Sequence, residues 1–187
     1  MQLLLASKSP RRRELLSQLG MPYSIVNIDV DEKLATPVPA SQVAESLSLL
    51  KAGGYDNELS EGDVLVTADT VVVLNDQVLG KPHSREEAMA MLNSLSGKAH
   101  QVYTGVTLRN SKETRCFTEC THVYFKNLTQ SEIEYYVDTY KPFDKAGAYG
   151  IQEWIGMVGI ERIEGCYYNV MGLPVARLYE ELKVLVD

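Results

Sequence analysis

The run Val64–Leu74 constrains the fold of this chain more than any other segment. It reads VLVTADTVVVL and consists mostly of β-branched residues. A nearly continuous apolar run of this length is typical of a strand that other elements cover on both faces. The pair Asn75-Asp76 that follows predicts a tight turn into a second strand over Gln77–Leu79. We therefore expect an α/β or α+β fold with helices on both sides of a sheet.

Apolar spacing and capping residues predict the other elements. Ser84 and Thr129 each begin a capping-box pattern, with Glu87 and Glu132 three residues later, and Pro174 opens the last helix. Strands and helices are interspersed without a repeat or a linker, which favours a single domain over residues 1–187. The expected strands cover residues 3–6, 23–28, 102–108 and 117–125, the first two helices cover residues 10–19 and 41–52, and residues 146–165 are expected to form loops and short strands.

The charge of the chain is unevenly distributed. The net charge is −7, but residues 1–13 carry four basic side chains and no acidic one, so the remainder carries −11. An acidic protein repels a nucleic-acid polymer, whereas one compact basic spot suits a small anion.

Three arginines stand at the start of the first expected helix, in Ser9-Pro10-Arg11-Arg12-Arg13. Ser9 is a favoured N-cap residue, and proline is favoured at the first helical position. Cations are disfavoured by roughly 0.3–1 kcal/mol each at this end of a helix. A phosphate chain bound between the guanidinium groups would remove that penalty, since a helix N-terminus also attracts anions. The alternative is a solvated arginine cluster that Glu14 partly neutralises.

Asp69 lies in the middle of the most apolar strand. Burying an unpaired carboxylate is costly, so such a group is normally paired, bound to a metal or protonated. The alternative is a strand end or bulge at which Asp69 reaches water or a backbone N–H. The neighbouring Thr70 is expected to point to the opposite face of the strand.

Several common classes of site are excluded by the motifs that the sequence lacks. There is no P-loop, no G-x-G-x-x-G between a strand and a helix, and no HExxH or related histidine pattern. Cys116, Cys120 and Cys166 lack the spacing of a zinc or disulfide framework. The sequence shows neither an apolar run of about 18 residues nor the pattern of a signal peptide, so we expect a cytoplasmic protein that does not associate with a membrane.

Six short segments together resemble the Maf proteins, in the order that the family shows. Each tripeptide alone is weak, but the ordered set spans nearly the whole chain. The segments are SKSPRR at residues 7–12, ADT at 68–70, GKP at 80–82, YTGV at 103–106, DKAGAYGIQ at 144–152 and NVMGLP at 169–174.

The resemblance implies both a fold and a reaction. The fold would be a mixed, twisted sheet in two lobes around a central cleft, as in the inosine triphosphatase-like enzymes, and the protein would be a homodimer. The reaction would be cleavage of a nucleoside triphosphate to the monophosphate and pyrophosphate with a divalent metal, Mg²⁺ or Mn²⁺. The segment AGAYGIQ resembles the subgroup that acts on dTTP and UTP, so these and modified pyrimidine nucleotides are the expected substrates.

The resemblance also implies roles for individual residues. Asp69 matches the proposed proton acceptor, and with Glu32 it would hold the metal; the sequence does not separate these two roles of Asp69. The positions linked to substrate choice are Arg11, Thr70 and Gln152, and those lining the phosphate end of the cleft are Ser9, Arg12, Lys51 and Lys81. The amide of Gln152 offers one donor and one acceptor, which fits the O4 and N3–H groups of uracil or thymine.

Two departures from the family pattern affect these expectations. Ser48 stands where the family usually has alanine, close to Lys51, and Glu153-Trp154 follow Gln152 where many members have glycine. Two alternatives also stay open. One is a nucleotide-binding regulator of septum formation with little turnover, and the other is an enzyme of the 7-methyl-GTP subgroup.

Overall fold

A computed structural model of the chain describes residues 2–186, and its central element is a mixed sheet. The seven strands follow the order β2-β1-β3-β5-β6-β7, with β4 beside β3. Strand β1 runs parallel to β2 and β3, and all other pairs are antiparallel. The strands are β1 (Gln2–Ala6), β2 (Tyr23–Ile25), β3 (Asp63–Leu74), β4 (Gln77–Leu79), β5 (Ala99–Arg109), β6 (Thr114–Phe125) and β7 (Ile160–Glu164).

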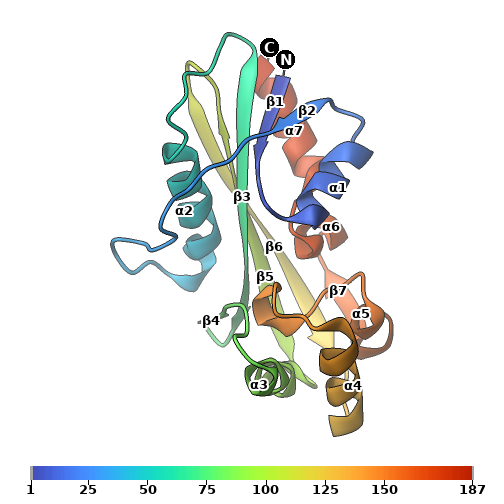
Figure 1. Cartoon of the computed structure of the whole chain (residues 1–187). Coiled ribbons are helices and arrows are strands. Elements are labelled where there is room, and N and C mark those ends of the chain that lie inside the picture. The colour runs from blue at the N-terminus through green and yellow to red at the C-terminus, as the bar shows by residue number, and fades with distance from the viewer. Residues whose placement is uncertain (1, 187) are drawn as a thin grey trace.

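Helices cover both faces of the sheet, as the sequence of β3 predicts (Figure 1). They are α1 (Pro10–Gln18), α2 (Ala40–Gly53), α3 (Arg85–Leu95), α4 (Gln130–Tyr140), α5 (Trp154–Gly159), α6 (Tyr167–Met171) and α7 (Val175–Val186), with a 3₁₀ turn, η1, at Ala146–Ala148. Across residues 2–186, no helix combines the length and the apolar character that a membrane crossing requires.

Strand β3 runs through two separate cores. Val64 and Val66 in its first half pack with α1 and α7. Val72 and Leu74 in its second half pack with α3, α4 and α5. Figure 1 shows the two groups of helices at different ends of the long strand. The expected arrangement of two lobes joined by one sheet is therefore present.

Successive side chains of β3 alternate between the two faces. Val71 and Val73 point to the face that α2 covers, whereas Ala68 points to the face that α1 and α7 cover. The turn between β3 and β4 has positive φ angles at Asn75 and Asp76, 50° and 61°, as a type I′ hairpin requires.

The structure corrects two expectations about secondary structure. Strand β2 ends at Ile25 rather than Ile28, and the side chains of Val26 and Ile28 pack against the cluster around Tyr55 instead. Residues 146–165, expected to form loops and short strands, contain the helix α5 despite their many glycines, which disfavour a helix. Packing overrides that low propensity, since Ile155 is completely buried in the core of the second lobe.

Candidate active site

A gap in the edge of β3 creates the main cavity of the molecule. On this edge, β1 pairs with residues 63–67 and β4 pairs with residues 72–74, which leaves residues 68–71 without a neighbouring strand. The segments that leave β1 and β4, residues 7–10 and 80–82, diverge there. A cavity of about 390 Å³ opens between them and reaches residues from both lobes.

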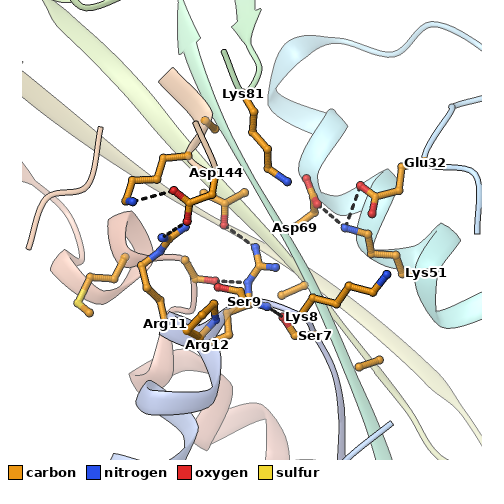
Figure 2. Close-up of a pocket in the computed structure, with 18 of the residues that line it drawn as sticks. Ser7, Lys8, Ser9, Arg11, Arg12, Glu32, Lys51, Asp69, Lys81 and Asp144 are labelled. Carbon is orange, nitrogen blue, oxygen red and sulfur yellow. Dashed lines mark hydrogen bonds and ion pairs between the residues drawn. The ribbon is translucent and has the colours of Figure 1, made fainter. Parts of the chain in front are cut away.

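Asp69 lies in this gap and forms an ion pair with Lys51 of α2. The Lys51 Nζ atom is 2.5 Å from Asp69 Oδ1 and 3.3 Å from Glu32 Oε2, so one ammonium group joins two carboxylates (Figure 2). The side chains of Asp69 and Lys51 are each 15% exposed, whereas that of Glu32 is 55% exposed. The buried carboxylate in the apolar strand is thus paired, which is the first of the possibilities that the sequence left open.

Two contacts hold α2 against the sheet and thereby place Lys51. A Cβ atom on Gly105 of β5 would lie 2.3 Å from the backbone nitrogen of Glu45, so only glycine allows the helix to approach this closely. Ser48 is completely buried, its hydroxyl lies 2.8 Å from that of Thr107, and its carbonyl accepts a hydrogen bond from Thr67 Oγ1 at 2.7 Å. Ser48, which replaces the usual alanine of the family pattern, therefore holds in place the helix that carries Lys51.

Thr70 points to the opposite face of β3, as expected for the residue next to Asp69. Its hydroxyl accepts a hydrogen bond from Arg12 Nη2 at 2.9 Å and lies 2.9 Å from Thr104 Oγ1. Arg12 Nε donates to the carbonyl of Gly172 at 2.8 Å. Burial lowers the pKa of Arg12, and the nearby Asp69 partly offsets this effect. Arg12 therefore presents a fixed guanidinium group whose two hydrogen-bond acceptors are both uncharged.

Arg11 is held from the other lobe. Its Nη1 atom lies 3.2 Å from Asp144 Oδ2, and Asp144 Oδ1 lies 2.8 Å from Lys145 Nζ. Partial burial opposes ionisation of Asp144, but the contacts with Lys145 and Arg11 outweigh it and hold the pKa of this carboxyl below its usual value. The third arginine, Arg13, does not line the cavity, because its guanidinium group binds the carbonyl of Ser7.

Two lysines reach the cavity without an acidic partner among residues 2–186. Figure 2 shows Lys81 extending from the end of β4 toward Asp69, and Lys8 extending from the end of β1 on the side of Lys51. Together with Arg12, they are the cations that a polyphosphate would meet without displacing a carboxylate.

The first helix begins where the sequence predicts, with Ser9 as N-cap and Pro10 in the first turn. The Ser9 side chain makes no capping hydrogen bond, and both residues line the cavity. The N-terminal N–H groups of α1 therefore begin at the cavity wall. Such groups attract anions.

The residues expected to hold a metal are Glu32 and Asp69. They fit a magnesium-type ion only if the substrate supplies further ligands. No cluster of three or more acidic, histidine or cysteine side chains occurs within residues 2–186. Glu32 and Asp69 nevertheless approach one point, the Lys51 ammonium. Mg²⁺ is commonly held by one or two carboxylates and completes its coordination with substrate phosphates and water. This pair of carboxylates meets that requirement.

Gln152 is the one expected site residue that the structure does not bring to the cavity. Its exposed side chain lines a second, shallow hollow of about 340 Å³ together with Met157 and Tyr167. The other expected residues, Ser9, Arg11, Arg12, Glu32, Lys51, Asp69, Thr70 and Lys81, all line the main cavity.

Three further residues that the sequence analysis assigned no role belong to the site or its wall. Lys8, Asp144 and Lys145 line the cavity. Lys8 lies within the SKSPRR segment, and the other two open the DKAGAYGIQ segment. Their position in these segments was the available signal, but nothing in the spacing indicates which side chains point inward.

Comparisons with known proteins find similar sequences that match nearly the whole chain. A family model described as Maf-like protein matches residues 2–185. A Bacteroides thetaiotaomicron protein named dTTP/UTP pyrophosphatase is 50% identical over 185 residues, which cover 98% of this chain and 96% of that protein. Proteins of the same name from Bacteroides fragilis and Phocaeicola vulgatus are each 48% identical over 185 residues, with the same coverage.

A solved structure supports the fold alone. The Staphylococcus aureus Ham1 protein superposes with a TM-score of 0.52 at 16% sequence identity, and the match covers 98% of each chain.

Proposed function

This chain belongs to the Maf-like protein family, and we propose that it hydrolyses dTTP and UTP to the nucleoside monophosphate and pyrophosphate. Relatives of nearly equal length carry the name dTTP/UTP pyrophosphatase at 48–50% identity. The observation that carries the proposal is the placement of Asp69 opposite Arg12 and Lys81 in one cavity. The cavity thereby brings together a carboxylate that can accept a proton and basic side chains that can bind phosphate.

Basic residues on three sides would bind the triphosphate. Phosphoryl transfer depends chiefly on positioning and on charge stabilisation, and a triphosphate carries about four negative charges near neutral pH. Arg12 and Lys81, with Lys8 beside them, supply positive charge that no described carboxylate neutralises. Ser9 and the first N–H groups of α1 add uncharged donors at the same wall.

Asp69 would act on the attacking water. A carboxylate within hydrogen-bond reach of that water can take its proton as it attacks the α-phosphorus. The Lys51 ammonium at 2.5 Å from Asp69 balances the negative charge before substrate binds. A divalent metal held by Glu32 and Asp69 would polarise the phosphate and make the water more acidic. Lys51 itself lines the cavity, so its ammonium group is also placed to contact a phosphate oxygen.

Residues on the other side of β3 would set the choice of nucleotide. Thr70 and Arg11 both line the cavity, and Arg11 contacts Asp144 of the opposite lobe. Gln152 follows two residues after Gly150, which also lines it. Its amide fits the donor and acceptor of uracil and thymine, so we propose that Gln152 contributes to the choice of base from this neighbouring position.

A pyrophosphate-release assay tests the proposal. The purified chain is offered dTTP, UTP, CTP, 7-methyl-GTP and the purine triphosphates, with and without Mg²⁺. We expect Mg²⁺-dependent pyrophosphate release from dTTP and UTP above all others. Binding of dTTP without release would favour the regulator, and preference for 7-methyl-GTP would transfer the chain to the other subgroup.

The same proposal includes the domain organisation, the oligomeric state and the cellular compartment of the enzyme. One sheet runs through both lobes, which supports a single functional domain over residues 1–187. Exposed Met157 and Tyr167 beside the second hollow offer apolar surface for a homodimer, which light scattering after size exclusion tests. Cys116, Cys120 and Cys166 are free thiols, in keeping with a reducing cytoplasm.

A further inference from the structure

A continuous series of polar contacts leads from the core of the second lobe to Arg11. The hydroxyl of Tyr136, on α4, donates a hydrogen bond to Glu153 Oε2. Glu153 Oε1 lies 3.1 Å from Lys145 Nζ, which lies 2.8 Å from Asp144 Oδ1. The other oxygen of Asp144 contacts Arg11 Nη1 at 3.2 Å. Each oxygen of both carboxylates therefore has a different partner.

The inner end of this series of contacts is buried, and the outer end is exposed. Tyr136 is completely buried, and the side chains of Lys145 and Glu153 are 9% and 19% exposed. The side chain of Asp144 is 61% exposed, so it is placed mainly by its two ion pairs. Tyr136 also accepts a hydrogen bond from the Gly150 N–H at 3.0 Å, which ties the cavity wall to the same anchor.

The alternation of acidic and basic side chains explains why Asp144 can form an ion pair with Arg11. Glu153 satisfies part of the positive charge of Lys145, so Lys145 does not require both oxygens of Asp144. Without the negative charge of Glu153, the nearly buried Lys145 would have Asp144 as its only carboxylate partner among residues 2–186. Asp144 would then turn toward Lys145 and away from Arg11, because an uncompensated buried charge is costly.

We propose that Glu153 is a positioning residue for substrate binding, acting through Lys145 and Asp144 to fix the orientation of the Arg11 guanidinium group. Glu153 does not line the cavity itself. Asp144 contacts only the Nη1 atom of Arg11, which leaves the remaining N–H groups of the guanidinium free to bind a nucleotide. A carboxylate that orients a binding side chain in this way reduces the freedom that the side chain loses when the ligand binds.

The inference rests on the proposed function for the identity of the ligand, and Glu153→Gln is the variant that tests it. Glutamine keeps the size of the side chain and an acceptor for Tyr136 but removes the charge that faces Lys145. We expect KM for dTTP to rise about 10-fold while kcat changes less than about threefold. The matched control is Glu164→Gln, because Glu164 also joins a tyrosine, Tyr124, to a basic residue, Arg162, but lies outside the cavity. This control should leave both constants unchanged.

A double-mutant cycle separates positioning of Arg11 from a general effect on the fold. In the Arg11→Ala background, Glu153→Gln should change kcat/KM by less than about twofold. An equal loss in both backgrounds, or no loss in the wild-type background, would overturn the proposal. Tyr136→Phe, which removes the anchor of Glu153, provides a second variant if Glu153→Gln does not fold, and it should raise KM in the same way.

A readout without turnover keeps this inference distinct from the proposed function. The side-chain ¹H–¹⁵N signals of Arg11, identified by their loss in Arg11→Ala, should shift in Glu153→Gln and stay in place in Glu164→Gln. Unchanged Arg11 signals in Glu153→Gln would contradict the positioning role even if the enzyme is active. A wild-type protein that releases no pyrophosphate would contradict the proposed function, while the shift of the Arg11 signals would still decide the role of Glu153.

Discussion

The Nζ atom of Lys51, on α2, lies 2.5 Å from Oδ1 of Asp69, in the gap of the β3 edge. This ion pair explains how a carboxylate is tolerated in the middle of a mostly apolar strand that is covered on both faces. It also places the acid at the point where β1 and β4 separate and substrate can enter. This one pair of residues therefore both makes the buried strand tolerable to a carboxylate and places that carboxylate in the site.

Asp69→Asn should abolish turnover while the protein remains folded. Asparagine keeps an oxygen for Lys51 but cannot take a proton and binds a metal more weakly. We expect kcat for dTTP to fall by about 100-fold or more, measured by pyrophosphate release. Asp76→Asn is the matched control, because Asp76 has a φ angle of 61° in the hairpin turn of the same strand, where asparagine is well tolerated. Near-normal hydrolysis by Asp69→Asn would remove Asp69 from the mechanism.

Arg12→Lys should weaken substrate binding more than it slows the chemical step. Arg12 donates to both Gly172 and Thr70, and a lysine cannot reproduce this planar geometry. We expect KM for dTTP to rise roughly 10-fold in steady-state kinetics, with a smaller change in kcat. Arg115→Lys serves as control, since Arg115 pairs with Glu113 away from the cavity. If KM and kcat both keep their wild-type values, Arg12 does not bind the phosphates.

Gly105→Ala and Gly53→Ala should change stability in opposite directions. The added Cβ at Gly105 would lie 2.3 Å from the Glu45 backbone and push α2 away from the sheet, at a cost of about 1–3 kcal/mol in the free energy of unfolding. Gly53, at the end of the same helix, has open space around it, and alanine should add about 0.5–1 kcal/mol.

Urea denaturation of the two glycine variants measures these changes. Because a displaced α2 also moves Lys51, Gly105→Ala should reduce kcat for dTTP as well. A Gly105→Ala protein as stable as the wild type would show that α2 does not need its close approach to β5.

The sequence predicts the elements of the fold better than the composition of the site. The apolar run of β3, the hairpin at Asn75 and the start of α1 depend on local chemistry, and the structure has all three. The position of α5 depends on burial of Ile155 between distant elements, which no local pattern contains.

The site shows the same distinction between local and long-range information. The alternation of Asp69 and Thr70 follows from the period of a strand, and the structure has it. The pairing of Asp69 with Lys51 joins two elements that only the folded sheet brings together. The series of polar contacts from Tyr136 to Arg11 likewise depends on the packing of α4 against the loop that follows it. Gln152 matched a motif, but the path of the backbone carries it to another surface.

His100 should make the stability of the protein depend on pH below about 6.5. Its ring is nearly completely buried, Nε2 lies 2.7 Å from the hydroxyl of Tyr149, and burial lowers the pKa of His100 to about 4. Above the unfolded pKa of about 6.5, the ring is neutral in both states and no stability is lost. As the pH falls from about 6.5 to 4, the unfolded chain takes up a proton that the folded chain does not, so the free energy of unfolding decreases by up to about 1.4 kcal/mol per pH unit. His100→Gln removes this contribution, whereas His83→Gln, at an exposed position, leaves it in place. Urea denaturation at several pH values should therefore show the wild type and His83→Gln losing stability more steeply than His100→Gln over this range. Parallel curves would mean that His100 takes up a proton as readily in the folded state as in the unfolded chain.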